Sequence, residues 1–336
     1  MITRRELNKL LLASSALAAG STLLSPAALA TTAKKQTDDE IFKLAVMTWS
    51  FHLELWKGEL KATDVPALVK SMGVDALEWA GKTFRDLHGG RELMFKAPPA
   101  AFFESLRRAS DDAGACNRVM SVGGPFYLAS VDSANRQKAL EFFMQYVEPA
   151  QILGCDILRA ELYCNAPHGP DREQEAKKLA MQGLHELLDR TEDSGLIINI
   201  ENHHGISSQP EWLADLVQSM DHPRLGLSVD TNNFRIDQDM PYERDFSELP
   251  RTVDRYQGLK TLMPLANWVS AKAYAFDGTG YEVSMDYPRI FDIFLNSGYS
   301  GYLSIEYEGE GDEIEGVRKT AAMFQRLREH FKLKQA

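Results

Sequence analysis

Eight short apolar runs alternate with longer amphipathic stretches, and this alternation limits the possible folds more than any other feature of the chain. The runs lie at 43–49, 73–79, 117–122, 155–162, 195–201, 224–230, 267–274 and 301–307. Helices are predicted at 64–72, 99–114, 133–153, 171–194, 210–220, 251–264, 286–297 and 313–332. Eight strand–helix units in roughly 290 residues predict a single-domain α/β protein, a (β/α)8 or TIM barrel.

A doubly wound parallel sheet is the alternative fold. It is disfavoured because no G-x-G-x-x-G motif follows any predicted strand, so dinucleotide binding has no support in the sequence. Gly73, Gly154, Gly195 and Gly298 stand where predicted helices end, which is typical of C-caps. The long connection 231–250 is predicted to be a loop over the mouth of the barrel.

The first 30 residues have the pattern of an export signal. Arg4 and Arg5 precede an apolar stretch, and Ala28-Leu29-Ala30 has the A-x-A form of a cleavage site. Paired arginines predict a twin-arginine signal, and therefore a periplasmic location. A retained membrane anchor is the alternative, disfavoured because the apolar stretch is short. Residues 31–40 are predicted to be a linker and residues 41–336 the barrel domain.

The net charge argues against anionic partners. The whole chain carries a formal charge of −11, and removing residues 1–30 takes away three basic residues and one acidic residue, which lowers it to −13. Such a chain repels phosphate backbones and anionic lipid surfaces, so we expect no nucleic-acid partner and no stable membrane association after signal cleavage. Among the three cysteines, Cys155 and Cys164 lie in or near apolar strand sequence, and buried free thiols are favoured over a disulfide.

Polar side chains share one parity at the ends of four consecutive predicted strands. In the fifth strand Glu201 and His203 alternate with apolar residues that should face the helices. Asp230, Lys272 and Glu306 have the same inward parity in the next three strands. In a barrel of this kind functional residues lie at the carboxyl ends of the strands, so we predict a site there.

Converging carboxylates must be compensated by protons or by cations. Arg159, inward by parity in the fourth strand, and Lys272 offer one solution, a purely structural ionic network. The other solution is a divalent cation held by Glu201, Asp230, Glu306 and His203. Ligands rich in oxygen with at most one imidazole favour Mn²⁺ or Mg²⁺.

Four motifs resemble the sugar phosphate isomerase/epimerase superfamily, the xylose isomerase-like TIM barrels. They are IENHHG, LSVDTNNF, VSAKAYAFDGTG and GYLSIEYEGEGDEIEGVRKT, and the resemblance extends over essentially the whole mature chain. In typical members a Glu, an Asp, a His and a Glu on strands five to eight bind one divalent cation, which implies Glu201, Asp230 and Glu306 here. Ser270 stands where the strand-seven His is expected, and His203 is the candidate replacement.

The resemblance implies a divalent-metal-dependent isomerase or epimerase that acts on a sugar or keto-sugar through an enediolate. Glu201 and Glu306 would be the acid/base pair, and Lys272 would stabilise developing negative charge or donate a proton. The predicted substrate-binding residues are Arg159, Trp49, His52 and Asn233, the last standing where members commonly have a His. Export favours an unphosphorylated carbohydrate as the small-molecule partner.

Two other functions stay open. A metal-dependent lyase that acts by β-elimination on a keto-glycoside would begin with the same proton removal. A non-catalytic sugar-binding or partner subunit with a degenerate metal site is the second. Endonuclease IV-like activity is disfavoured because it needs a histidine-rich multi-metal site, whereas this chain has eight histidines and no such cluster. The particular sugar and the oligomeric state, including a homo-oligomer, are left open.

Overall fold

A computed structural model describes residues 41–84, 96–124, 127–166, 171–236 and 251–335. The predicted signal peptide, the linker 31–40 and most of the predicted mouth loop 231–250 lie outside the described residues. The twin-arginine signal and the periplasmic location therefore stay predictions.

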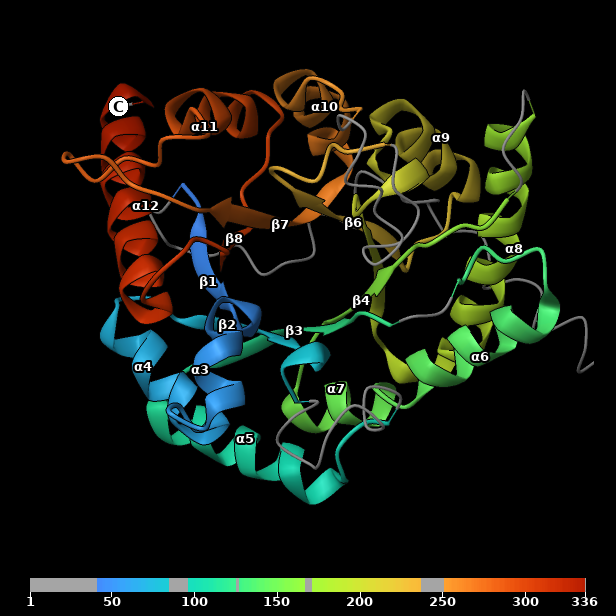
Figure 1. Cartoon of the computed structure of the whole chain (residues 1–336), viewed down its shortest axis with the longest axis horizontal. Coiled ribbons are helices and arrows are strands. Elements are labelled where there is room, and N and C mark those ends of the chain that lie inside the picture. Colours follow the sequence, from blue (N-terminus) through green and yellow to red (C-terminus); the bar gives the residue numbers. More distant parts are fainter. Residues whose placement is uncertain (1–40, 85–95, 125–126, 167–170, 237–250, 336) are drawn as a thin grey trace, which may run out of the picture. The chain divides into compact units, whose positions relative to one another are not determined.

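The strands form a closed parallel barrel in which each strand pairs with the next and β8 pairs with β1 (Figure 1). Their bounds are β1 Lys43–Met47, β2 Ala76–Ala80, β3 Cys116–Val122, β4 Ile157–Glu161, β5 Ile197–Glu201, β6 Leu225–Asp230, β7 Ala266–Ala273 and β8 Tyr302–Tyr307. The predicted (β/α)8 barrel is confirmed, with every strand within a few residues of its predicted place.

The α-helices surround the barrel (Figure 1). They are α3 His52–Lys57, α4 Val65–Ser71, α5 Ala100–Ala113, α6 Ser133–Met144, α7 Val147–Leu153, α8 Arg172–Arg190, α9 Pro210–Met220, α10 Arg255–Leu262, α11 Tyr287–Asn296 and α12 Glu313–Gln335. The single helix predicted over 133–153 is wrong, because the chain breaks between α6 and α7. Pro149 is the reason, since its ring clashes with the carbonyl four residues earlier, at Gln145, and its nitrogen has no hydrogen to donate.

Apolar side chains fill two layers on opposite sides of the strands. The larger core lies between strands and helices and includes Ile198 and Ile200 of β5. A smaller cluster closes the amino-terminal part of the barrel interior and contains Ala45, Ala76, Val119, Ile157 and Trp268. Further along the same inward parity the residues become polar, so the predicted alternation is confirmed and the polar layer lies at the carboxyl end.

Local details of the chain agree with the sequence. Gly73, Gly154, Gly195 and Gly298 all have φ between 72° and 77°, the left-handed conformation expected after a helix. Cys155 and Cys164 are buried free thiols as predicted, and Cys116 is an exposed one. Among the described helices, none has the length and apolar character needed to cross a membrane.

Candidate active site

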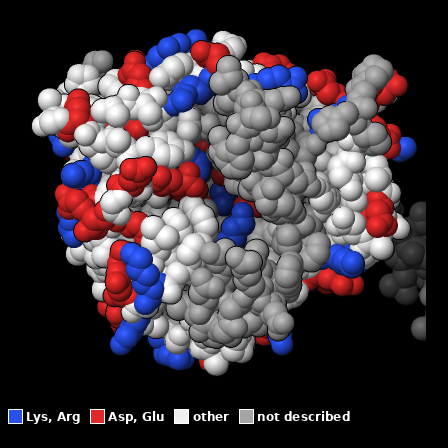
Figure 2. Space-filling view, viewed as in Figure 1, with Lys and Arg blue, Asp and Glu red and all other residues white. Residues whose placement is uncertain are grey.

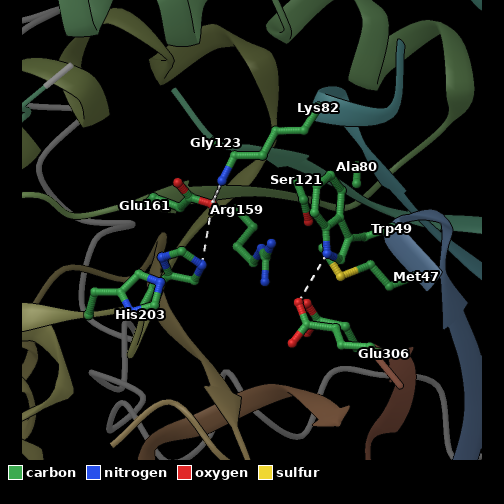
Figure 3. A pocket seen from close by; sticks show the side chains of 12 residues that line it. Met47, Trp49, Ala80, Lys82, Ser121, Gly123, Arg159, Glu161, His203 and Glu306 are labelled. Carbon is green, nitrogen blue, oxygen red and sulfur yellow. Dashed lines mark hydrogen bonds and ion pairs between the residues drawn. The ribbon is translucent and has the colours of Figure 1, made fainter. Parts of the chain in front are cut away.

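A pocket of about 200 Å³ opens at the carboxyl end of the barrel. Figure 2 shows basic side chains within a hollow near the centre of this face, with acidic side chains along one side of it. The lining consists of Met47, Trp49, Ala80, Lys82, Ser121, Gly123, Arg159, Glu161, His203, His204, Glu306 and Glu308 (Figure 3). The lining therefore combines charged side chains with apolar surface from Met47, Trp49 and Ala80.

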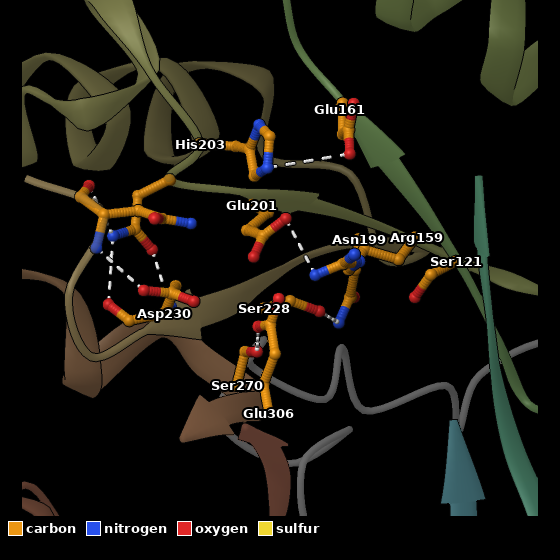
Figure 4. Close-up of polar contacts among 12 residues, drawn as sticks. Ser121, Arg159, Glu161, Asn199, Glu201, His203, Ser228, Asp230, Ser270 and Glu306 are labelled. Atoms are coloured by element: carbon orange, nitrogen blue, oxygen red, sulfur yellow. Dashed lines mark hydrogen bonds and ion pairs between the residues drawn. The ribbon is translucent and has the colours of Figure 1, made fainter. Parts of the chain in front are cut away.

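Three carboxylates converge at one side of this pocket. Glu201, Asp230 and Glu306 are the inward residues at or near the ends of β5, β6 and β8, and all three are buried. One oxygen of each lies within 4.8 Å of the others, so the barrel brings together residues from three strands that are far apart in the sequence (Figure 4). The convergence expected from strand parity is present; the metal and catalytic roles assigned to these residues stay predictions.

Two buried cations are in contact with the three carboxylates. Arg159 Nη1 lies 2.7 Å from Glu201 Oε2. Lys272 Nζ lies 3.1 Å from Glu306 Oε1 and 3.9 Å from Asp230 Oδ2. The structural ionic network considered from the sequence therefore exists.

The network does not balance the charge around it. Within the described part of the chain, this end of the barrel holds six carboxylates, those of Glu78, Glu161, Glu201, Asp230, Glu306 and Glu308. Three side-chain cations face them, from Lys82, Arg159 and Lys272. The carboxylates outnumber these cations by three, and the buried carboxylates among them need bound protons or an added cation.

Burial and neighbouring charges shift the acids in different directions. Burial raises the pKa of Asp230 to about 8, against the opposing effect of Lys272. Burial likewise raises the pKa of Glu201 well above its ordinary value, even beside Arg159. Burial also acts to raise the pKa of Glu306, but Lys272 and Arg159 outweigh it and the pKa is lowered. Without an added cation, part of the charge is thus removed by protonation at Asp230 and Glu201.

The donor set fits a divalent cation. Asp230 Oδ1 accepts hydrogen bonds from the backbone N–H groups of Asn232 and Asn233, each at 2.7 Å. Its other oxygen, Oδ2, is buried and accepts none. A buried carboxylate oxygen without a donor is costly, and a cation shared with Glu201 and Glu306 would satisfy it. Hard carboxylate oxygens suit Mg²⁺ or Mn²⁺.

Asn202 and Ser270 orient the carboxylates. The Asn202 side chain donates to the carbonyl of Asp230 at 3.0 Å and accepts from its N–H at 2.7 Å. Ser270, at the position of the missing strand-seven His, donates from Oγ to Glu306 Oε2. This position therefore holds a carboxylate in place and supplies no nitrogen ligand.

His203 contacts Tyr163 and Glu161 on the side of β4. Its Nδ1 is 3.1 Å from the Tyr163 hydroxyl, and its Nε2 is 3.7 Å from Glu161 Oε1. It forms a group with Glu161 and Glu201 within 4.8 Å, and this group shares only Glu201 with the group that contains Asp230 and Glu306. Its role as replacement ligand stays a prediction.

The predicted substrate-binding residues are only partly brought together. Arg159 and Trp49 line the pocket, and Trp49 Nε1 donates to Glu308 at 3.0 Å. His52 stacks on Trp49 with ring centroids 4.3 Å apart and pairs with Glu313 at 3.0 Å, so it supports Trp49 from outside the lining. Asn233, also outside the lining, accepts at its carbonyl from Asn202.

Sequence reasoning missed three charged residues of the pocket. Glu308 accepts from Lys272 Nζ at 2.7 Å, and it follows Glu306 at the two-residue spacing that could have revealed it. Glu161 has the inward parity of Arg159, so strand alternation gives its direction but not its place in the pocket. Lys82 lies in a 3-10 turn, Gly81–Phe84, where no strand period applies, so no sequence signal identified it.

Metal affinity should depend on pH in a direction set by Asp230. Below about pH 8 its carboxyl is protonated in the metal-free protein, so a cation must displace at least one proton. We expect Mn²⁺ to bind at least about tenfold more tightly for each pH unit gained up to about 8. Calorimetric titration between pH 6 and 9 measures this. An affinity that does not change over this range would contradict it.

Comparison with known proteins shows the family of the chain. Residues 66–327 match the model of the xylose isomerase-like TIM barrel family, and the chain belongs to this family. The resemblance inferred from the strand-end motifs is confirmed in this respect.

The relatives include carbohydrate-active enzymes. Over 136 residues, 38% of this chain, it is 37% identical to the C-glycoside deglycosidase alpha subunit of Arthrobacter globiformis, and the match spans only 38% of that protein. An L-ribulose 3-epimerase structure superposes with a TM-score of 0.64 at 16% identity, covering 88% of this chain and 97% of the other. The structure of the 3-keto-D-glucoside 4-epimerase of E. coli superposes with a TM-score of 0.60 at 14% identity, covering 85% of this chain and 99% of the other. These two structures share the fold.

Proposed function

We propose that the protein is a divalent-metal-dependent isomerase or epimerase of a sugar or keto-sugar, acting through an enediolate. The observation that carries the proposal is the buried group Glu201, Asp230 and Glu306, whose carboxylate oxygens lie within 4.8 Å of one another beside the pocket. These three residues would hold the cation. When bound, a divalent cation polarises a carbonyl oxygen as a Lewis acid and stabilises negative charge that develops there.

The surrounding side chains suit proton transfer next to a carbonyl. Glu306 is kept ionised by Lys272 and Arg159, so it can accept a proton from the carbon beside the carbonyl. Glu201, whose pKa is raised by burial, would donate a proton of its own to the deprotonated substrate. Delivery to the neighbouring carbon gives isomerisation, and delivery to the opposite face of the same carbon gives epimerisation.

Lys272 and Arg159 would bind oxygen atoms of the substrate. Neighbouring carboxylates raise the pKa of Lys272 well above its ordinary value, against the effect of burial. Lys272 therefore keeps its proton and stabilises negative charge, and it is a poor proton donor. Arg159 is buried in the same way and stays charged.

A β-elimination is the second candidate function. The match to a C-glycoside deglycosidase alpha subunit favours it, since loss of a group β to the deprotonated carbon would follow the same first step. A keto-glycoside would then be the substrate. That relative's description as a subunit also leaves a partner protein open.

Metal analysis and a substrate panel test the proposal. We expect about one Mn²⁺ or Mg²⁺ per purified mature chain, and turnover of at least one of L-ribulose, D-tagatose, D-allulose and a methyl 3-keto-D-glucoside after metal loading. NMR of the products separates isomerisation, epimerisation and release of the aglycone. Removal of the metal with EDTA should abolish turnover, and Mn²⁺ should restore it.

A metal-free protein that cannot be reconstituted would contradict the proposal. The carboxylates would then be explained by Arg159 and Lys272 alone, and a sugar-binding or partner subunit would become the better conclusion. Metal content of His203→Ala, measured in parallel, shows whether the imidazole belongs to the ligand set. If His203→Ala kept its full metal content, His203 would not be one of the metal ligands.

A further inference from the structure

A second polar group, not used in the proposed reaction, lies across the pocket from Glu306 (Figure 3). Lys82 Nζ donates to Glu161 Oε1 at 2.6 Å, and the Tyr163 hydroxyl donates to Glu161 Oε2 at 2.6 Å. The Glu161 side chain is almost fully buried, whereas Lys82 remains 35% exposed within the lining. Both oxygens of Glu161 are therefore oriented, and the ammonium group is held at the surface of the cavity.

The backbone is shaped to hold this pair. Glu161 ends β4 and stands opposite Glu201 in the β4–β5 register, while Lys82 comes from the turn after β2. Between them β3 ends and is followed by Gly123. A Cβ at Gly123 would overlap Lys82 Cε and crowd both Lys82 Nζ and Glu161 Oε1. Glycine at this position is what allows Lys82 to reach Glu161.

The pair offers a donor and an acceptor side by side. The Lys82 ammonium group has three N–H bonds, and one of them donates to Glu161. A carboxylate has about four lone-pair positions, of which Lys82 and Tyr163 occupy two. A sugar hydroxyl group can therefore accept a hydrogen bond from Lys82 and donate one to Glu161. A phosphate dianion can only accept, and it would be repelled by Glu161 and by Glu308 on the opposite wall.

We propose that Lys82 and Glu161, placed by Gly123, form a hydroxyl-binding subsite that selects an uncharged sugar. The proposal rests on the proposed function, since it names the substrate class of the same pocket. In this arrangement one sugar hydroxyl lies at the Lys82–Glu161 pair while the carbonyl end of the sugar faces Glu201, Asp230 and Glu306. Lys82 and Glu161 bind the substrate and take no part in moving its proton.

Steady-state kinetics of Lys82→Met test the subsite, with the panel sugar that the wild type converts fastest as the probe. We expect kcat/KM to fall by about 10- to 100-fold through KM, since a hydrogen bond from a charged donor is lost. Cation content and kcat should change little. Lys177→Met is the matched control, because Lys177 pairs with Asp215 at 2.5 Å outside the pocket lining. It should leave KM unchanged.

Gly123→Ala provides a second variant that keeps both charges. Its Cβ should push Lys82 away from Glu161, so KM should rise while thermal unfolding followed by circular dichroism shows a folded protein. The phosphate ester of the probe sugar at its terminal hydroxyl, the 5-phosphate for L-ribulose and the 6-phosphate for the others, should be converted by the wild type at least about tenfold less efficiently than the sugar itself, through repulsion by the two carboxylates.

The outcomes separate this subsite from the proposed function. A wild type that converts no panel sugar contradicts the proposed function, and the subsite falls with it. An active wild type whose KM is unchanged in both Lys82→Met and Gly123→Ala overturns the subsite alone. A loss of kcat at constant KM overturns it too, because the pair would then act in proton transfer. If the wild type converted the phosphate ester more efficiently than the sugar itself, the proposed selection of an uncharged sugar would be wrong.

Discussion

Glu306→Gln is expected to lower kcat by about 100- to 10,000-fold and to remove most of the bound cation. The carboxylate is one of three that would hold the metal, and it is the ionised group best placed to accept the proton. Glutamine keeps the shape and the contact with Ser270 but removes the charge. Kinetics with the best panel sugar and elemental analysis of the purified variant measure both effects.

Glu282→Gln is the control for this substitution. Glu282 is also a buried glutamate, but it lies outside the pocket lining and accepts from the backbone N–H of Ser284 at 2.8 Å. It should retain the cation and nearly full turnover. If Glu306→Gln kept wild-type metal content and wild-type kcat, neither the ligand role nor the base role of Glu306 would survive.

Arg159→Met is expected to destabilise the protein by about 3–5 kcal/mol, the second large effect. The guanidinium is almost fully buried and pairs with two buried acids, Glu201 at 2.7 Å and Glu78 at 3.4 Å. Methionine fills part of the volume but leaves the buried acids Glu78 and Glu201 without their guanidinium partner. Urea unfolding of metal-free protein in EDTA measures the loss, and added Mn²⁺ should recover part of it through Glu201.

Arg118→Met is the matched control for burial. Arg118 pairs with Asp156 at a similar distance, 2.7 Å, but both side chains are more than one-third exposed. An exposed pair contributes about 0–1 kcal/mol, so this variant should unfold close to the wild type. Equal losses for Arg159→Met and Arg118→Met would mean that burial of the Arg159 network adds nothing to stability.

Strand periodicity predicted which side chains face inward, but not the contacts that they make beyond the strand ends. Glu201 is the last residue of β5, and His203, two residues further, still lines the pocket as its parity predicts. Its ring turns toward Glu161 on the neighbouring strand. His52 likewise lies in α3, past the end of β1, and pairs with Glu313 of α12. Loop and turn residues have no period from which their direction can be inferred.

By itself the sequence determined the order of strands and helices and the inward direction of Glu201, Asp230 and Glu306. Both follow from local alternation, which a single strand carries on its own. Only the tertiary structure decided which charges meet. The Lys82–Glu161 and Lys272–Glu308 contacts join residues from different strand ends, at 2.6 and 2.7 Å. Such contacts depend on strand register and on a glycine at position 123, which take effect only when the barrel closes.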